Sequence, residues 1–299
     1  YGLPEEETLN WPRYGMVPTG DYHEDLKNAS REYAALMTMC DAHLGRLLDF
    51  LDDHDMWKDT ALIVNTDHGF LLTEHNWWGK VREPIYDELA HTPFFLWDPR
   101  SGVRNEHRGA LCQTIDIAPT LLDFFNVPIP QDMQGKALRD TVASDQPVRE
   151  YALFGMHGFH VNVTDGRYVY MRTPVREHLD DLYDYMQTPT SYPNSVTLDK
   201  LRQGQMCWDF HFTKGTPLLR LPGHCMGMIP NDPEALYAPD GLYGEGNLLF
   251  DLEQDPKQLQ PLHDEAVESR MIEAMKQLME ENEAPAEQYV RLGLSPENT

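Results

Sequence analysis

The densest group of residues able to do chemistry is the run Asn65-Thr66-Asp67-His68-Gly69, which directly follows a short apolar segment at 61–64. A carboxylate beside an imidazole offers two metal ligands of different hardness. Ligands of open α/β sheets bind just beyond the carboxyl ends of strands, where Asp67 and His68 are expected. The pair therefore predicts a divalent-metal site, although an Asp-His-Gly turn alone is more often structural.

The next loop, residues 73–80, adds a basic group, a histidine and two tryptophans. A lysine near a metal can hold an anionic oxygen and offset charge on a leaving group. We predict Lys80 as a catalytic and substrate-binding residue, with His75 and Trp78 of the same loop as further candidates for the site. Each also has an ordinary structural interpretation, as a solvated lysine, a hydrogen-bonded histidine and a packed tryptophan.

The segments that must position these residues alternate between predicted helices and predicted strands, as in an α/β domain. Apolar residues recur at helical spacing from 35 to 51, and the helix should end near His54. Segments 61–64 and 92–97 are expected as strands buried on both faces, in a mostly parallel sheet. A helix follows at about 115–125, with Asp116 as its expected cap and Pro119 in its first turn. This pattern continues to about residue 145.

The second half, residues 146–299, has a different character. Asp165-Gly166 between two β-rich runs predicts a hairpin. A strand at 248–252 and a closing helix from about 267 indicate a small antiparallel sheet with one helix packed on it. Between the hairpin and the strand at 248–252, residues 173–246 form a long insertion, which is either a structured loop without a role in function or a lid that shapes specificity. His224 is its most site-like residue, and we predict that it contacts substrate.

Composition limits the classes of partner. The formal net charge is −25, which disfavours binding to nucleic acid or to anionic lipid. The four cysteines show no zinc-ligand spacing, and no apolar run approaches a membrane span. The beginning at Tyr1 resembles a cut end, so the sequence leaves the compartment open.

Several ordered motifs resemble the sulfatase family of the alkaline phosphatase superfamily. Residues 59–69 (DTALIVNTDHG) resemble its metal strand and turn, and residues 74–80 (EHNWWGK) resemble its G-E-H-G-x-x-G-K segment. Residues 115–122 (IDIAPTLL), 134–138 (QGKAL) and 249–256 (LFDLEQDP) resemble later family segments. The resemblance implies a partial three-layer α/β/α alkaline-phosphatase-like core over 1–145. It also implies an α+β subdomain over 146–299 with an antiparallel sheet and a C-terminal helix.

The resemblance also implies roles for individual residues. Asp67 and His68 would be metal ligands, with Ca²⁺ expected and Mn²⁺ or another divalent ion as the alternative. Lys80 would bind a sulfate oxygen, and His75 would line or support the pocket. His91 would also belong to the catalytic site, either near the substrate or in support of residues that contact it. The family's nucleophile, a formylglycine made in a C/S-x-P-x-R motif, has no counterpart here. We therefore expect a piece of a bacterial sulfatase that lacks its N-terminal segment and is inactive alone.

Two other functions remain open. His68 stands where many sulfatases have Asn, which also fits a phosphonate monoester or phosphodiester hydrolase of the same superfamily. A non-catalytic binding module derived from the fold is the second alternative, although the set Asp67, His68 and Lys80 argues against it. The expected partners are a sulfated small molecule or glycan and, because a partial sheet exposes apolar surface, a second copy or a missing segment.

Overall fold

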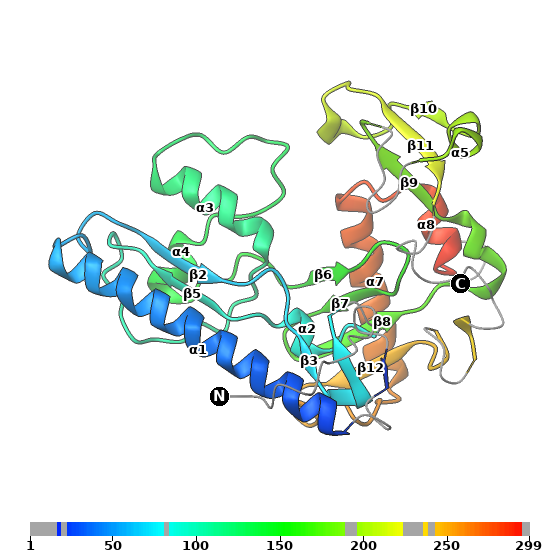
Figure 1. Cartoon of the computed structure of the whole chain (residues 1–299). Coiled ribbons are helices and arrows are strands. Elements are labelled where there is room, and N and C mark those ends of the chain that lie inside the picture. Colours follow the sequence, from blue (N-terminus) through cyan, green and yellow to red (C-terminus); the bar gives the residue numbers. More distant parts are fainter. Residues whose placement is uncertain are drawn as a thin grey trace. The chain divides into compact units, whose positions relative to one another are not determined.

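The computed structural model describes residues 17–18, 23–80, 84–188, 196–223, 236–238 and 243–294. It divides into two compact units (Figure 1). The first comprises Tyr1–Gly109 with Arg139–Gln146, and the second comprises Ala110–Leu138 with Pro147–Thr299. The domain division predicted from the sequence, 1–145 and 146–299, stays a prediction, since contacts alone do not show which parts fold independently.

The first unit consists of a long helix, two small sheets and short helices. Its elements are β1 (Val17–Pro18), α1 (His23–Asp53), β2 (Leu62–Asn65), β3 (Leu71–Leu72), η2 (Glu74–Asn76), β4 (Trp77–Gly79), α2 (Asp87–Ala90), β5 (Phe94–Trp97) and α4 (Arg139–Ser144). One sheet has the order β1-β4-β3, and the other pairs β2 with β5. Helix α1 ends where the sequence predicts, because Asp55 turns into the left-handed region at φ 54°.

The pairing of β2 with β5 differs from the prediction. The two strands are antiparallel, with Leu62 opposite Trp97 and Asn65 opposite Phe94. To form a parallel pair, the chain must cross from the end of the first strand back to the end of the sheet where that strand began, usually through a helix. The link between β2 and β5 instead contains only short elements and brings the chain back in the opposite direction. The prediction of strands buried on both faces is also wrong, since Phe95 is 67% exposed.

The second unit contains two antiparallel sheets and the C-terminal helices. Its elements are η3 (Thr114–Asp116), α3 (Ile117–Phe124), β6 (Ala152–Gly155), β7 (Val161–Thr164), β8 (Tyr168–Arg172), η4 (Arg176–Asp181), β9 (Tyr183–Met186), α5 (Leu198–Arg202), β10 (Gln205–Cys207), η5 (His211–Thr213), β11 (Leu218–Pro222), β12 (Leu248–Asp251), α7 (Glu265–Glu281) and α8 (Ala286–Arg291). The sheets have the orders β12-β8-β7-β6 and β10-β11-β9. The second sheet lies inside the insertion, where the sequence showed only weak periodicity.

The core of this unit lies between α7 and the four-stranded sheet (Figure 1). Met271 and Met275 of α7 pack with Val163, Tyr170 and Leu249 from three of the strands. The predicted hairpin, strand, closing helix and antiparallel sheet are all confirmed. At the hairpin, the Asp165 carboxylate accepts hydrogen bonds from the backbone N–H groups of Arg167 and Tyr168, and Gly166 takes φ 93°.

Asp116 has a different role from the predicted cap. Its side chain makes no capping hydrogen bond to α3. The carboxylate is fully buried and forms an ion pair with Arg149 at 2.5 Å. It also accepts hydrogen bonds from the backbone N–H groups of Gln113 and Lys136. Asp116 therefore ties three segments of the second unit together. No helix among the described residues has the length and apolar character needed to cross a membrane.

Candidate active site

The loop after β2 is fixed by a close backbone approach. Gly69 donates its N–H to the Leu89 carbonyl of α2 at 2.9 Å. A Cβ at Gly69 would lie 1.7 Å from the Glu88 carbonyl oxygen, so a larger residue cannot pack there. Glycine is required for this contact and not for a left-handed turn. The contact fixes the backbone at Gly69, immediately after Asp67 and His68.

The His68 ring has one assignable proton. Its Nδ1 lies 2.9 Å from the Gly69 carbonyl oxygen. A carbonyl oxygen only accepts, so Nδ1 must donate, and a neutral ring then keeps its lone pair on Nε2. Nε2 lies 3.3 Å from the Asp67 Oδ2 atom. The lone pair of His68 Nε2 thus faces the Asp67 carboxylate oxygen. A proton on Nε2 or a cation between the two atoms would stabilise this arrangement.

Asp67 presents its carboxylate to solvent, with 81% of the side chain exposed. Its other oxygen accepts hydrogen bonds from the His68 N–H and the Thr66 hydroxyl. Desolvation acts to raise the pKa of Asp67, but the positive charge of His68 when its ring is protonated and the hydrogen bonds outweigh it and hold the pKa below its usual range. The Asp67 carboxylate is therefore ionised at neutral pH.

The donor set fits two positions of a divalent-metal site. When two ligand atoms each lie about 2.3 Å from one ion, and the angle between the two bonds at the ion is a right angle, the atoms are about 3.3 Å apart. The distance between Asp67 Oδ2 and His68 Nε2 matches this value. Within the described part of the chain, no group of three or more His, Cys, Asp or Glu side chains could hold a metal ion. Asp67 and His68 alone would therefore offer a metal ion two ligands at most.

His75 is held rigidly beside this loop. Its ring stacks on Tyr86 at 3.5 Å with only 5° between the planes, and Nε2 lies 3.4 Å from Glu88 Oε2. The backbone of His75 takes φ 52°, a conformation that costs energy for a non-glycine residue. The side chain is almost fully buried, which suits support of the loop better than direct contact with substrate. No sequence signal singled out Tyr86 or Glu88.

Lys80 and Trp78 have contrasting environments. Lys80 follows β4 directly, is half-buried and forms no ion pair with the described residues. Trp78 is only 2% exposed and packs with Ala29 of α1 and with Phe70. This packing explains Trp78 without a ligand, because almost none of its surface is accessible. Its substrate-binding role stays a prediction that the packing disfavours.

His91 lies at the end of α2 and is exposed. Its Nδ1 lies 3.1 Å from the Asp87 Oδ2 atom, and this hydrogen bond raises the pKa of His91 above its ordinary value. The structure gives no contact between His91 and Asp67 or Lys80. His224, the predicted substrate contact in the insertion, lies outside the described residues. The structure therefore groups Asp67, His68 and His75 around α2, with Lys80 in the same unit.

Two family models match the chain. The model described as Sulfatase covers residues 7–127, and the model described as N-sulphoglucosamine sulphohydrolase, C-terminal, covers residues 73–206. Their overlap contains Lys80 and His91. The first model contains the Asp67–His68 pair, and the second reaches into the insertion.

Two curated relatives match about half of the chain. An N-acetylglucosamine-6-O-sulfatase of Bacteroides thetaiotaomicron is 31% identical over 154 residues, which cover 48% of this chain and 27% of that protein. An arylsulfatase of Clostridium perfringens is 31% identical over 137 residues, which cover 45% of this chain and 28% of that protein. The chain thus matches little more than a quarter of each relative's length.

A solved structure of a protein bound to its substrate, D-glucosamine-2-N,6-O-disulfate, has a similar fold. It aligns with a TM-score of 0.55 and 16% identity, over 88% of this chain and 42% of that one. The likeness confirms the alkaline-phosphatase-like fold class with its C-terminal antiparallel sheet and helix. The family models, the curated relatives and the fold all show similarity to the sulfatase family, and the two models together match residues 7–206.

Proposed function

We propose that this chain supplies one side of a metal-dependent site that hydrolyses sulfuric esters. The observation that carries the proposal is the pair Asp67 and His68, whose Oδ2 and Nε2 atoms lie 3.3 Å apart at the end of β2. The carboxylate is ionised, the imidazole lone pair faces it, and the contact between Gly69 and α2 fixes the backbone immediately after both residues. Similarity to the sulfatase family supports the same chemistry.

The metal would be held by Asp67 and His68 together with ligands from outside the described residues. A bound divalent ion would neutralise charge on the ester and on the attacking group. Calcium suits a carboxylate-rich site, and the imidazole keeps Mn²⁺ or another divalent ion as the alternative. Lys80 would donate to a sulfate oxygen, and its lack of an ion pair with the described residues leaves the ammonium available.

The histidines divide into supporting and substrate-proximal roles. His75, stacked on Tyr86, keeps the loop before Lys80 in one conformation. His91 would lie near the substrate, where its pairing with Asp87 favours the protonated ring. His224 stays a predicted substrate contact.

The nucleophile would come from another part of the protein. No Cys or Ser in the sequence begins a C/S-x-P-x-R motif. The chain also exposes apolar residues on α1 and β5, which normally pack against other elements: Leu36, Met37, Met39, Leu47, Phe50 and Phe95. In this proposal, the rest of the sulfatase core, with its formylglycine, covers that surface and completes the metal site. A second copy of the chain is the alternative cover.

The substrate would be a sulfated small molecule or glycan. The similarity to an N-acetylglucosamine-6-O-sulfatase supports a sulfated sugar, whereas the similarity to an arylsulfatase supports a broader range of esters. Because the matched segments cover little more than a quarter of these proteins, we propose only this class of substrate and no particular sulfated compound.

The second candidate is a phosphonate monoester or phosphodiester hydrolase on the same fold. The observation that favours it is His68 at a position where many sulfatases have Asn. A third candidate, a binding module without catalysis, would leave the ionised Asp67 and the Lys80 ammonium without a chemical role.

The proposal is tested on the natural gene product. Its intact mass and N-terminal sequence are determined, and turnover of 4-nitrophenyl sulfate and bis-4-nitrophenyl phosphate is measured on the same sample. A product that contains formylglycine and cleaves the sulfate much faster supports the sulfatase proposal. Faster cleavage of the phosphate diester supports the second candidate. A product that begins near Tyr1 and cleaves neither ester contradicts catalysis.

A further inference from the structure

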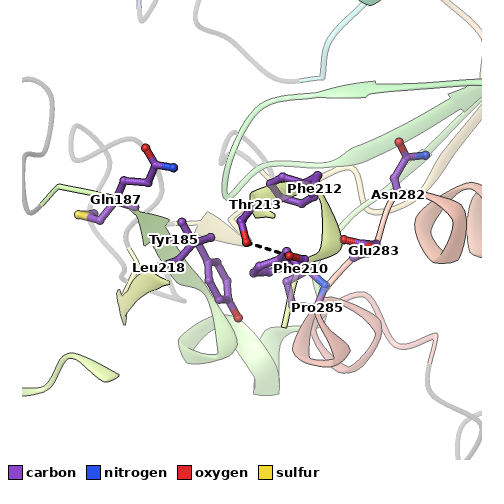
Figure 2. Close-up of a pocket in the computed structure, with 11 residues that line it drawn as sticks. Tyr185, Gln187, Phe210, Phe212, Thr213, Leu218, Asn282, Glu283 and Pro285 are labelled. Atoms are coloured by element: carbon purple, nitrogen blue, oxygen red, sulfur yellow. Dashed lines mark hydrogen bonds between the residues drawn. The ribbon is translucent and has the colours of Figure 1, made fainter. Parts of the chain in front are cut away.

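The second unit contains a pocket that belongs to no part of the proposed ester site. It has a volume of about 560 Å³ and lies between the β9–β11 sheet, η5 and the turn that joins α7 to α8 (Figure 2). Ligand pockets for small molecules commonly have about 300–1,000 Å³. Its lining combines aromatic rings with amide and carboxylate side chains, among them Tyr185, Gln187, Phe210, Phe212, Asn282 and Glu283.

Aromatic rings form the apolar wall of this pocket. Tyr185 and Phe210 meet edge to face with their centroids 5.1 Å apart, and Phe210 and Phe212 lie 5.3 Å apart. The Tyr185 hydroxyl donates to the Glu287 carboxylate, which fixes the ring. Phe212 is 47% exposed, so it offers a ring face to a ligand. The wall is preformed, because Phe210 also packs with Cys207 and Leu218.

Polar side chains form the rest of the lining (Figure 2). The Glu283 carboxylate accepts hydrogen bonds from the His211 N–H at 2.8 Å and lies 2.6 Å from His211 Nδ1. Each carboxylate oxygen can still accept another bond. Asn282 donates from Nδ2 to the Leu278 carbonyl, which fixes the direction of its amide. The exposed Gln187 adds a second amide at the rim.

Glu283 lies in the turn that ends α7. It takes φ 56°, the left-handed conformation common just past a helix C-terminus, and the Ala284 N–H donates to the Met279 carbonyl oxygen across the same turn. This turn holds the Glu283 carboxylate at the pocket and within reach of His211.

We propose that this pocket binds a neutral pyranose ring. The C–H face of a sugar packs on exposed aromatic rings, while its hydroxyl groups donate to a carboxylate and exchange hydrogen bonds with amides. Glu283 opposes a sulfate group at the same place, because two anions repel in a partly desolvated site. The pocket thus recognises an unsulfated sugar, and this inference does not depend on the ester site.

The test is a titration of the full ¹⁵N-labelled chain with N-acetylglucosamine and with its 6-O-sulfate, followed by amide chemical shifts. The wild-type chain should give saturable shifts with the neutral sugar and weaker binding of the sulfated one. Phe212→Ala should weaken binding about 3- to 10-fold, as loss of one aromatic contact implies. Glu283→Gln should weaken it by about tenfold, because a charged acceptor is lost.

Trp208→Ala is the matched control, since Trp208 is an exposed aromatic residue of the same insertion that does not line the pocket. It should leave the affinity unchanged. Absence of saturable binding to the wild-type chain overturns the proposal. Unchanged affinity in the folded Phe212→Ala variant, equal loss in Trp208→Ala, or tighter binding of the sulfated sugar also overturns it.

Discussion

The two units differ in how completely this chain buries their apolar residues. In the second unit, Met271 and Met275 are fully buried between α7 and a four-stranded sheet. In the first, the sheet formed by β2 and β5 has two strands, and α1 exposes several large apolar side chains. Both helices are amphipathic in sequence, so the pattern alone does not tell which face finds a partner. The candidate chemistry lies in the less covered unit.

The largest expected effect concerns the buried ion pair of the second unit. Arg149→Ala leaves the Asp116 carboxylate buried with only its two backbone donors. Breaking a buried pair by removing one partner should cost about 3–5 kcal/mol of unfolding free energy. Urea unfolding followed by circular dichroism measures it. Arg202→Ala, which breaks the exposed pair with Asp199, is the control and should leave the midpoint unchanged.

The contrast in burial is tested by two methionine truncations. Met275→Ala should cost about 2–5 kcal/mol, because it creates a cavity in a closed core. Met37→Ala on the exposed side of α1 should change the unfolding free energy by less than about 0.5 kcal/mol. Equal losses in the two variants would break the comparison and would indicate that α1 is covered in solution by another chain.

A smaller effect should appear in acid within the insertion. Asp184 of β9 lies 2.8 Å from both His157 Nε2 and Lys200 Nζ. Desolvation raises the pKa of Asp184, but these two partners outweigh it and lower the pKa. The stabilisation is therefore present above the unfolded pKa of about 3.9 and is lost as the pH falls through the folded pKa.

Thermal unfolding of Asp184→Asn and of the wild-type chain measures this effect. The variant should melt at a lower temperature at pH 7, and the difference should shrink toward pH 3. A difference that persists unchanged at pH 3 would show that the carboxylate's charge is not its cause.

The smallest effect is expected at His91 of the first unit. Its hydrogen bond to Asp87 raises its pKa, so the stabilisation is present below about pH 6.5 and is lost as the pH rises through the folded pKa. The pair is exposed and screened, and the change in stability should be slight. An NMR titration of the ring proton gives the pKa directly. Asp87→Asn should return it toward 6.5, and an unchanged value would exclude the pairing as the cause.

Sequence patterns predicted the elements better than their partners. The end of α1, the Asp165-Gly166 hairpin and α7 follow from periodicity and turn chemistry, which are local properties. The direction of β5 against β2 depends on the whole intervening path, which local patterns do not encode. The small sheet of the insertion was missed for the same reason, since β11 pairs with β9 across residues 187–217.

The candidate site shows the same division. The Asp67–His68 pair was recognisable from residue type and position after a strand. The contact of Gly69 with Glu88 and the stack of His75 on Tyr86 were not, because both arise from tertiary packing around α2. Trp78 shows a second limit of the sequence, since its burial against Ala29 and Phe70 also depends on tertiary packing.

The central claim, that Asp67 is a metal ligand of an ester-hydrolysing site, has one direct measurement. In the natural product that cleaves 4-nitrophenyl sulfate, kcat/KM is compared for Asp67→Asn and for Asp59→Asn, an exposed carboxylate that precedes the same strand. Asp67→Asn should lose about 100-fold or more, and excess Ca²⁺ or Mn²⁺ should restore part of it. Asp59→Asn should match the wild type. Equal turnover by the two variants would contradict the claim.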